Sequence, residues 1–276
     1  MMDVYQEAAE ILARAKQAVA FSGAGVSAES GIPTFRDPGG IWDKFEPEEV
    51  GTVPALLRTA RDNPHIIRKF LLDTVTVFEK SKPNQAHRCV ARLEKMGIVA
   101  AVITQNIDGL HTEAGSRKVI EIHGSLLRGR CLACGKTFPL QREDLFKRVH
   151  ELLDDESSFS IDKVALILPT CSCGAITRPD VVMFGESVQQ IQDAFQTAAR
   201  CDVMLILGTS GVVYPAAACP AEAYRAGAKL IEINPNENCF GSMTDVFIKA
   251  SAERAMSELI ERVENRIAER SGAPNG

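Results

Sequence analysis

One stretch near the N-terminus constrains the fold of this chain more than any other. Residues 22–36 read Ser-Gly-Ala-Gly-Val-Ser-Ala-Glu-Ser-Gly-Ile-Pro-Thr-Phe-Arg, and they follow an apolar run, residues 18–21, that suits a short buried strand. Glycine at positions 23 and 25 would let backbone N–H groups approach a phosphate with no Cβ in the way, and Ser27 adds a small donor. The stretch therefore predicts a dinucleotide-binding loop at the end of the first strand.

The residues after this loop differ from the crossover of a nicotinamide dehydrogenase. That crossover leads from its third glycine into a helix and a second strand, with an acidic residue for the ribose about 20 residues on. Here Pro33 interrupts, and Asp37-Pro38-Gly39-Gly40 cannot continue a helix. We therefore expect a loop that holds a dinucleotide and folds over it. A tight turn between core elements is the alternative, and it would suit an isolated Gly-x-Gly better.

Short apolar runs alternate with helical patterns along the rest of the chain. This alternation predicts an α/β fold with a mostly parallel, doubly wound sheet. The expected strands are residues 18–21, 99–104, 119–123, 203–207, 229–233 and 245–249. The expected helices are residues 3–17, 45–80 with breaks near Pro54 and Pro64, 84–95, 187–200, 215–226 and 252–269, with a polar helical insertion around 140–165.

Four of the predicted strands end in small or polar clusters. Because the carboxyl ends of parallel strands form the ligand crevice of such a sheet, these clusters would offer amides and hydroxyls to phosphates, riboses and a carboxamide. Any one of them alone would suit an ordinary loop. The clusters are Gly23-Ala24-Gly25, Gln105-Asn106-Ile107-Asp108, Gly208-Thr209-Ser210 and Asn234-Pro235-Asn236.

Three residues near these strand ends are candidates for chemistry. Asn106 and Asp108 are two residues apart, which puts them on one side of an extended segment. A carboxylate there could hold a nicotinamide amide and stabilise positive charge on the ribose, although an Asx-type helix cap is the alternative. His123 precedes Gly124 and could act as a general base, or be a structural histidine. We interpret His65, His87, His111 and His150 as structural.

Two pairs of cysteines predict a structural zinc site. Cys131 and Cys134 form one pair, Cys171 and Cys173 the other, and 36 residues separate the pairs. Residues i and i+2 of an extended strand face one way, so both sulfurs of the tighter pair could reach one ion. A redox pair or free thiols are the alternative. We interpret Cys89, Cys201, Cys219 and Cys239 as plain buried thiols.

Composition excludes some classes of function. The net charge of −5 over 276 residues argues against general affinity for nucleic acid or anionic membrane. No apolar run reaches the roughly 20 residues that a membrane span needs. The first residues are polar and acidic, unlike a secretion signal, so we expect a cytoplasmic protein. No feature of the sequence predicts an oligomer.

The motifs together resemble those of the sirtuins, the NAD-dependent protein-lysine deacylases of the Sir2 type. They occur in the family's order over about residues 5–265. The resemblance implies one catalytic domain, residues 1–276, with a Rossmann-type large part over about 1–44, 84–128 and 177–270. It also implies a helical lid over about 45–83 and an inserted zinc module over about 129–176.

The resemblance also assigns roles to residues. It implies that His123 is the catalytic base, that residues 181–186 form a strand that pairs with the substrate peptide, and that Phe184 lies near an acyl-lysine tunnel. The implied NAD loop is Gly23, Ala24, Gly25, Phe35 and Arg36; the nicotinamide and ribose pocket is Gln105, Asn106, Ile107 and Asp108; the adenosine side is Gly208, Ser210, Asn234 and Ala252; the peptide segment includes Val181, Val182, Gly185 and Glu186; and the zinc ligands are the four paired cysteines.

The activity implied is transfer of an acyl group from lysine, on a protein or peptide, to ADP-ribose. NAD would be consumed, and nicotinamide and O-acyl-ADP-ribose released. A mono-ADP-ribosyltransferase and a non-catalytic NAD-binding sensor are the alternatives, with a dehydrogenase a distant third. Sirtuins that prefer succinyl- or malonyl-lysine carry a Tyr-x-x-Arg pair in the lid. Residues 69–76 have no such pair, so we expect acetyl or longer neutral acyl groups to be preferred.

Overall fold

The computed structural model describes residues 3–34 and 40–272. Its larger sheet has six strands, all parallel, in the order β3-β2-β1-β7-β8-β9. The chain winds outward in both directions from β1 and β7, so the predicted doubly wound fold is confirmed, and a crevice is expected where the winding reverses. The strands are β1 (Ala18–Ser22), β2 (Val99–Thr104), β3 (Val119–Glu121), β7 (Val203–Leu207), β8 (Lys229–Ile233) and β9 (Val246–Ile248).

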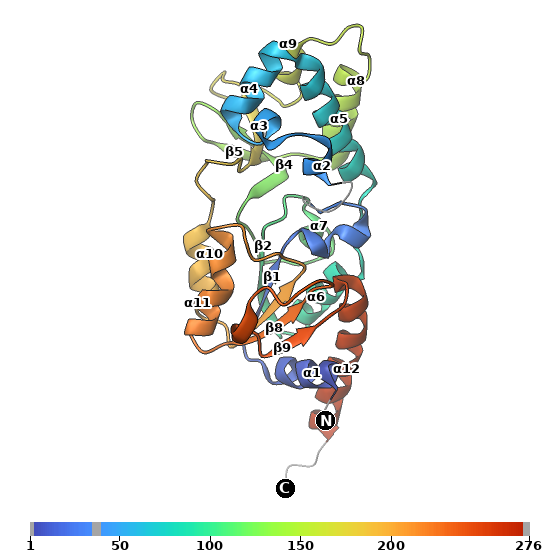
Figure 1. Ribbon diagram of the computed structural model, residues 1–276, viewed down its shortest axis with the longest axis vertical. Coiled ribbons are helices and arrows are strands. Elements are labelled where there is room, and N and C mark those ends of the chain that lie inside the picture. Colours follow the sequence, from blue (N-terminus) through green and yellow to red (C-terminus); the bar gives the residue numbers. More distant parts are fainter. Residues whose placement is uncertain (1–2, 35–39, 273–276) are drawn as a thin grey trace.

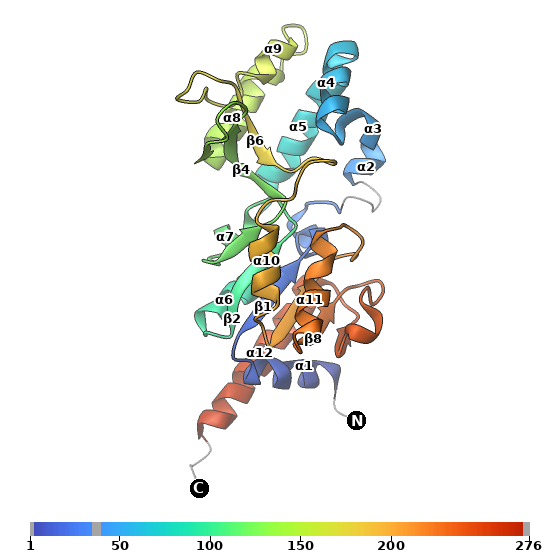
Figure 2. The same ribbon diagram turned by 90° about the vertical axis from the view of Figure 1, so that its left-hand side faces the viewer.

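Helices cover both faces of this sheet (Figures 1 and 2). Alternate side chains of β1 explain why both faces need cover: Ala18 and Ala20 join the core on one side, Val19 and Phe21 the core on the other. All five residues of β1 are buried, as expected for a strand covered on both faces. One face carries α1 (Val4–Arg14), α6 (Gln85–Lys95) and α12 (Ala252–Gly272); the other carries α10 (Ile191–Ala198) and α11 (Cys219–Arg225).

The second sheet is small and antiparallel, with the order β5-β4-β6. It lies with a group of helices in the upper part of Figure 1, where α5 packs on α8 through a buried apolar cluster that includes Phe78, Phe146 and Leu153. The first strand of this sheet starts directly after His123, so the two sheets meet beside that residue. The elements are β4 (Gly124–Cys131), β5 (Thr137–Pro139), β6 (Thr177–Val181), α8 (Arg142–Leu153) and α9 (Ile161–Val164).

The breaks predicted near Pro54 and Pro64 are confirmed, and both prolines lie at the start of the helix that follows the break. Pro54 lies in the first turn of α4 and Pro64 is the first residue of α5, positions where the missing N–H costs no helical hydrogen bond. Thr52 caps α4, since its side chain accepts from the Ala55 N–H at 3.1 Å. The division into large part, lid and zinc module remains a proposal. The lid helices are α2 (Ile41–Lys44), α3 (Pro47–Val50), α4 (Val53–Asp62) and α5 (Pro64–Lys80).

Three predicted strands were too long, and one of them, expected over residues 245–249, is β9 (Val246–Ile248). The strand expected over residues 119–123 ends at Glu121, and the one expected over 181–186 is wrong beyond Val181, where β6 ends. Residues 182–186 form a turn, because the Glu186 N–H donates to the Met183 carbonyl at 3.0 Å and Gly185 has φ of 86°. The short helices along the chain are η1 (Ala24–Val26), η2 (Ala28–Ser30), α7 (Leu110–Glu113), η3 (Ala216–Ala218) and η4 (Gly241–Met243).

None of the helices in residues 3–34 and 40–272 is both long and apolar enough to cross a membrane.

Candidate functional site

The glycine loop packs directly on the end of β7. The Gly23 N–H donates to the Leu207 carbonyl at 3.0 Å, and the Gly25 N–H donates to the Gly208 carbonyl at 2.8 Å. A Cβ on Gly25 would lie 2.8 Å from the Gly208 Cα, closer than real Cβ contacts. The reason for glycine therefore differs from the one expected: these two N–H groups are occupied, and the missing side chains let two backbone segments touch. For the Ala24 N–H, residues 3–34 and 40–272 supply no acceptor.

Replacing Gly25 with alanine is therefore expected to displace the loop. The new methyl group would meet backbone, which cannot rotate away, so we expect a loss of about 2 kcal/mol or more in unfolding free energy and weaker NAD binding. Denaturant unfolding and calorimetry with NAD measure the two effects. Gly227→Ala is the control for the NAD measurement, because a Cβ there meets nothing within 4 Å and its φ of 91° makes the substitution cost stability away from the loop. Equal NAD affinity in the two variants would contradict the prediction.

A buried network joins the glycine loop to the end of β2. Ser27 Oγ donates to Asp108 Oδ2 at 2.7 Å and accepts from Asn106 Nδ2 at 3.1 Å. Asp108 Oδ1 accepts from the Leu110 N–H at 2.9 Å, so the carboxylate caps α7 as well as facing Ser27. Burial raises the pKa of the Asp108 carboxyl, and these hydrogen bonds oppose the rise. The two predicted residues Asn106 and Asp108 thus meet on one serine.

Two histidines that we interpreted as structural belong to the wall of this network. His87 Nε2 lies 3.3 Å from Ser27 Oγ, and His111 Nε2 lies 2.9 Å from Ser22 Oγ. Their rings contact edge to face, with centroids 4.8 Å apart. Burial lowers the pKa of His87 to about 4 and that of His111 well below its usual value, so both are neutral at pH 7. No local pattern signals these contacts, because 60 and 89 residues separate the partners.

His123 is held in one orientation by the main chain. Its Nδ1 lies 2.9 Å from the Gln105 carbonyl oxygen, and a carbonyl can only accept, so Nδ1 carries the proton of the neutral ring. The lone pair is then on Nε2, where a general base needs it. Burial lowers the pKa of His123, partly offset by this hydrogen bond. The His123 carbonyl accepts from the Val182 N–H at 2.9 Å, which ties the candidate base to the proposed peptide segment.

The remaining strand ends are bound to one another. Gln105 Nε2 donates to Thr209 Oγ1 at 2.9 Å, and Asn234 Nδ2 donates to the Thr209 carbonyl at 2.9 Å. The clusters predicted after β1, β2, β7 and β8 are therefore contiguous at one edge of the sheet. Cys239 also lies there: it is half-buried and donates to the Thr209 carbonyl at 3.2 Å, so its interpretation as a plain buried thiol was wrong.

Other predicted contacts have different surroundings. Ala252 begins α12 and is buried in the core beneath the sheet edge. Ile107 is partly buried and packs toward the upper apolar cluster, whereas Ser210, Pro235 and Asn236 are exposed. Phe35 and Arg36 lie outside the described residues.

The proposed peptide segment connects to the lid. The Phe184 N–H donates to the Gly51 carbonyl at 3.0 Å, and the Phe184 ring is 55% exposed. Glu186 holds the turn itself, because its Oε2 accepts from the Met183 N–H and from Arg178 Nη2. The acidic side chain is therefore engaged within the turn, and the Phe184 side chain lies at its surface.

The four paired cysteines come together as predicted. Their Sγ atoms all lie within 4.8 Å of one another, with Cys131 and Cys173 3.5 Å apart and Cys134 and Cys171 3.7 Å apart. Four thiolates about 2.3 Å from a tetrahedral zinc ion would be about 3.8 Å apart, so the cluster fits zinc. The predicted strand at the second pair is wrong: residues 171–174 form a turn, in which the Gly174 N–H donates to the Cys171 carbonyl at 2.8 Å.

Comparison with known proteins agrees with this geometry. A sequence model of the Sir2 family matches residues 23–215. An NAD-dependent protein deacylase of Desulfosudis oleivorans is 51% identical over 258 residues, 93% of this chain and 94% of the relative. The crystal structure of a Sir2 homologue bound to NAD superposes with a TM-score of 0.77 at 37% identity, covering 97% of this chain and 96% of that one.

A second solved structure carries a peptide. It is a Sir2 protein bound to a myristoylated histone peptide, with a TM-score of 0.70 at 36% identity, and the match covers 98% of this chain and all of the other. From the family match and the extent of these similarities, the chain belongs to the Sir2 family.

Proposed function

We propose that this protein is an NAD-dependent protein-lysine deacylase, which transfers the acyl group of a modified lysine to ADP-ribose and releases nicotinamide. The observation that carries the proposal is the fixed imidazole of His123, whose Nδ1 is bonded to the carbonyl of Gln105, the residue before Asn106, so that Nε2 is left unprotonated. Relatives named as NAD-dependent protein deacylases support it. NAD serves as a co-substrate: its nicotinamide–ribose bond breaks and its sugar accepts the acyl group.

Each group at the sheet edge has a proposed part in this reaction. Asn106 and Asp108 hold the nicotinamide end, and the buried carboxylate stabilises positive charge that develops on the ribose. His123 Nε2 then takes a proton from a ribose hydroxyl, which makes that oxygen nucleophilic toward the acyl carbon. The Gly208–Ser210 and Asn234–Asn236 clusters hold the adenosine side. The four cysteines hold a structural zinc ion, which takes no part in the chemistry.

The substrates on the other side are acyl-lysine proteins or peptides. The turn after β6 presents the exposed Phe184 and is bonded both to the lid and to His123, which suits a segment against which a peptide chain would lie. The related Sir2 protein that binds a myristoylated histone peptide supports this assignment.

Mass spectrometry of an acyl-peptide panel incubated with NAD tests the function. We expect free lysine peptide, nicotinamide and O-acyl-ADP-ribose in equal amounts. ADP-ribose attached to protein with no acyl-ADP-ribose would identify a mono-ADP-ribosyltransferase instead. Binding of NAD and peptide without any product would identify a non-catalytic sensor.

The reaction should lose rate at acidic pH. A general base must be unprotonated, and burial lowers the pKa of His123 below the ordinary 6.5, so its neutral form persists down to a pH below that value. We expect kcat/KM for the peptide to be flat through neutral pH and to fall only as pH drops through this lowered pKa. A pH–rate profile measures it, and an acidic limb centred above pH 7 would contradict the assignment.

Neutral acyl groups should be better substrates than acidic ones. The lid cations nearest the upper apolar cluster are engaged: Arg68 donates to the Leu153 carbonyl at 2.6 Å, and Lys69 pairs with Asp73 at 2.8 Å. A succinyl carboxylate would therefore have to displace one of these two bonds to pair with either cation, and it would have to be desolvated. We expect deacetylation and removal of longer neutral chains to exceed desuccinylation by at least about tenfold in kcat/KM, and faster desuccinylation would contradict this.

A further inference from the structure

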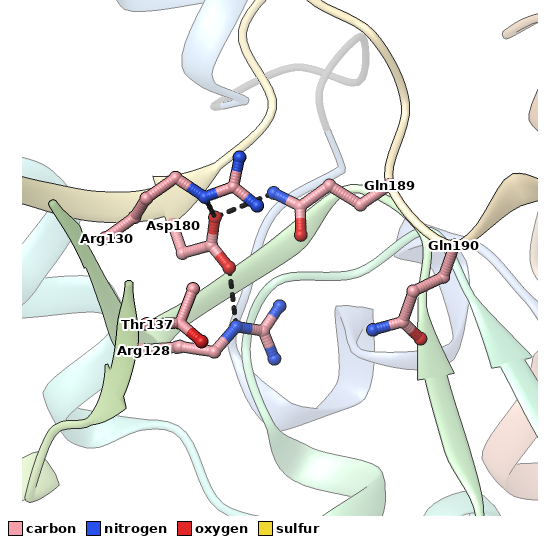
Figure 3. Close-up of a pocket in the computed structure, with 6 residues that line it drawn as sticks. All are labelled: Arg128, Arg130, Thr137, Asp180, Gln189 and Gln190. Carbon is pink, nitrogen blue, oxygen red and sulfur yellow. Dashed lines mark hydrogen bonds and ion pairs between the residues drawn. The ribbon is translucent and has the colours of Figure 1, made fainter. Parts of the chain in front are cut away.

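A pocket outside the proposed NAD, peptide and zinc residues lies where β4 and β6 meet the start of α10. It has a volume of about 420 Å³. Figure 3 shows two guanidinium groups and two side-chain amides turned toward the same space. The lining residues are Arg128, Arg130, Thr137, Asp180, Gln189 and Gln190.

Asp180 is the buried centre of the pocket wall, and both of its oxygens are engaged. Oδ2 accepts from Arg128 Nε at 2.6 Å, and Oδ1 accepts from Gln189 Nε2 at 2.7 Å. Arg130 Nε lies 2.7 Å from Oδ1, close enough for an ion pair, although its N–H is not aligned for a hydrogen bond. Glu121 is engaged too, by Arg128 Nη1 at 2.9 Å. Both carboxylates at this pocket therefore already accept hydrogen bonds from side chains around it.

Donors, in contrast, remain unused. Arg128 Nη2 is buried and finds no partner among residues 3–34 and 40–272, which is costly for a charged group. The side chain of Arg130 is 38% exposed, and it lines the same pocket. Guanidinium N–H groups without partners, beside carboxylates that are already paired, suit a ligand rich in acceptors, and guanidinium geometry matches phosphate and carboxylate groups.

The start of α10 adds to this preference. Gln190 is the N-cap of α10 and has φ of 48°, the single positive φ of a non-glycine residue in the described part of the chain. Such a conformation costs free energy and is concentrated at binding sites. The positive end of the helix dipole lies at this cap, beside the two arginines. An anion here would contact β4 and α10 together.

We propose that this pocket is a second ligand site of the protein, which binds a small phosphomonoester through Arg128, Arg130 and the cap of α10. The volume exceeds that of a bare ion and falls in the range of small-molecule sites. The pocket also brackets the turn after β6, since Asp180 precedes it and Gln189 follows it, with the Gln189 N–H bonded to the Ile122 carbonyl at 3.1 Å. The bound ligand therefore braces both ends of this turn.

Calorimetric titration of the full chain tests the proposal directly and needs no catalytic activity. Inorganic phosphate and free O-phosphoserine are titrated in the presence of saturating ADP-ribose, which keeps the dinucleotide crevice filled. We expect both to bind, and Arg130→Gln to weaken them at least about tenfold. Arg61→Gln is the matched control, because it removes the same charge from an exposed side chain of α4 that pairs with the neighbouring Asp62. Thr137→Val, at the exposed rim, is a second variant should Arg130→Gln unfold, and it should weaken binding several-fold.

The outcomes separate cleanly. The proposal is overturned if neither inorganic phosphate nor O-phosphoserine binds. It is also overturned if Arg130→Gln and Thr137→Val leave the binding unchanged. Binding that ADP-ribose abolishes also overturns it, because the phosphate would then have occupied the dinucleotide crevice. A phosphoserine peptide that binds more tightly than free O-phosphoserine would support the site and would indicate that its natural ligand is a phosphorylated protein.

Discussion

Replacing His123 with alanine is expected to lower the rate of O-acyl-ADP-ribose formation by at least about 10²-fold. A main-chain carbonyl, that of Gln105, places the proton of this imidazole on Nδ1, so that Nε2 is free to accept. A methyl side chain cannot take the proton of a ribose hydroxyl, and water would have to replace it. The affinity for NAD should change little, because Asn106, Asp108 and Ser27 form their network without His123.

The order of steps sharpens this test. In the proposed reaction the proton transfer to His123 follows the cleavage of the nicotinamide–ribose bond. Exchange of labelled nicotinamide into NAD should therefore survive the substitution better than deacylation does. His65→Ala is the control, because the His65 side chain is 67% exposed and its partners in the described part of the chain, Glu156 and Phe159, lie between α8 and α9. Deacylation above about a tenth of the wild-type rate in His123→Ala would remove His123 from the role of base.

Removing zinc is expected to have the largest effect on stability. Structural zinc contributes about 10–16 kcal/mol of apparent binding free energy in small domains, more than the whole stability of most folded chains. Cys131 ends β4 and pairs across to Thr177 at the start of β6, so the ion closes the open end of the small sheet. We expect Cys171→Ser, or chelation of the wild type, to unfold the sheet and helices built on it, with loss of one zinc per chain.

Activity should be lost together with that sheet. β4 starts directly after His123, and the His123 carbonyl accepts a hydrogen bond from Val182, the residue that follows β6. Unfolding of the small sheet would therefore displace the His123 imidazole. Metal analysis, circular dichroism and deacylation measured on the same samples test this. Cys201→Ala is the control, since that buried thiol lies outside the cluster and bonds only to the Ala198 carbonyl. An unchanged fold after complete removal of the metal would contradict the prediction.

The buried network explains why so many neutral groups surround one carboxylate. Ser27 can donate to Asp108 only if it accepts from its other neighbours, and Asn106 and His87 supply those bonds as donors. A neutral His87 also keeps a second charge away from a group that burial already destabilises when ionised. The network thus holds the single charge of Asp108 at the sheet edge.

The sequence by itself determined the parts of this protein that local patterns encode. Apolar runs of strand length define β1, β2, β7 and β8, and the topology of parallel strands then forces their polar ends together, so the edge at Gly23, Asn106, Thr209 and Asn234 was predictable. The four cysteines were predictable too, because zinc needs that ligand type. The turn at Cys171 was not, since the sulfurs can converge from either backbone shape.

Tertiary structure alone decided which distant residues touch. Ser27 meets His87 across 60 residues and Asp108 across 81, and Arg128 meets Asp180 across 52. Such contacts depend on the register of the strands and the rotation of each helix about its axis, which no short stretch of sequence encodes. The occupied N–H groups of Gly23 and Gly25, the neutral histidines behind the site and the arginine pocket beside α10 all have this origin, because each arises where two separately encoded elements pack.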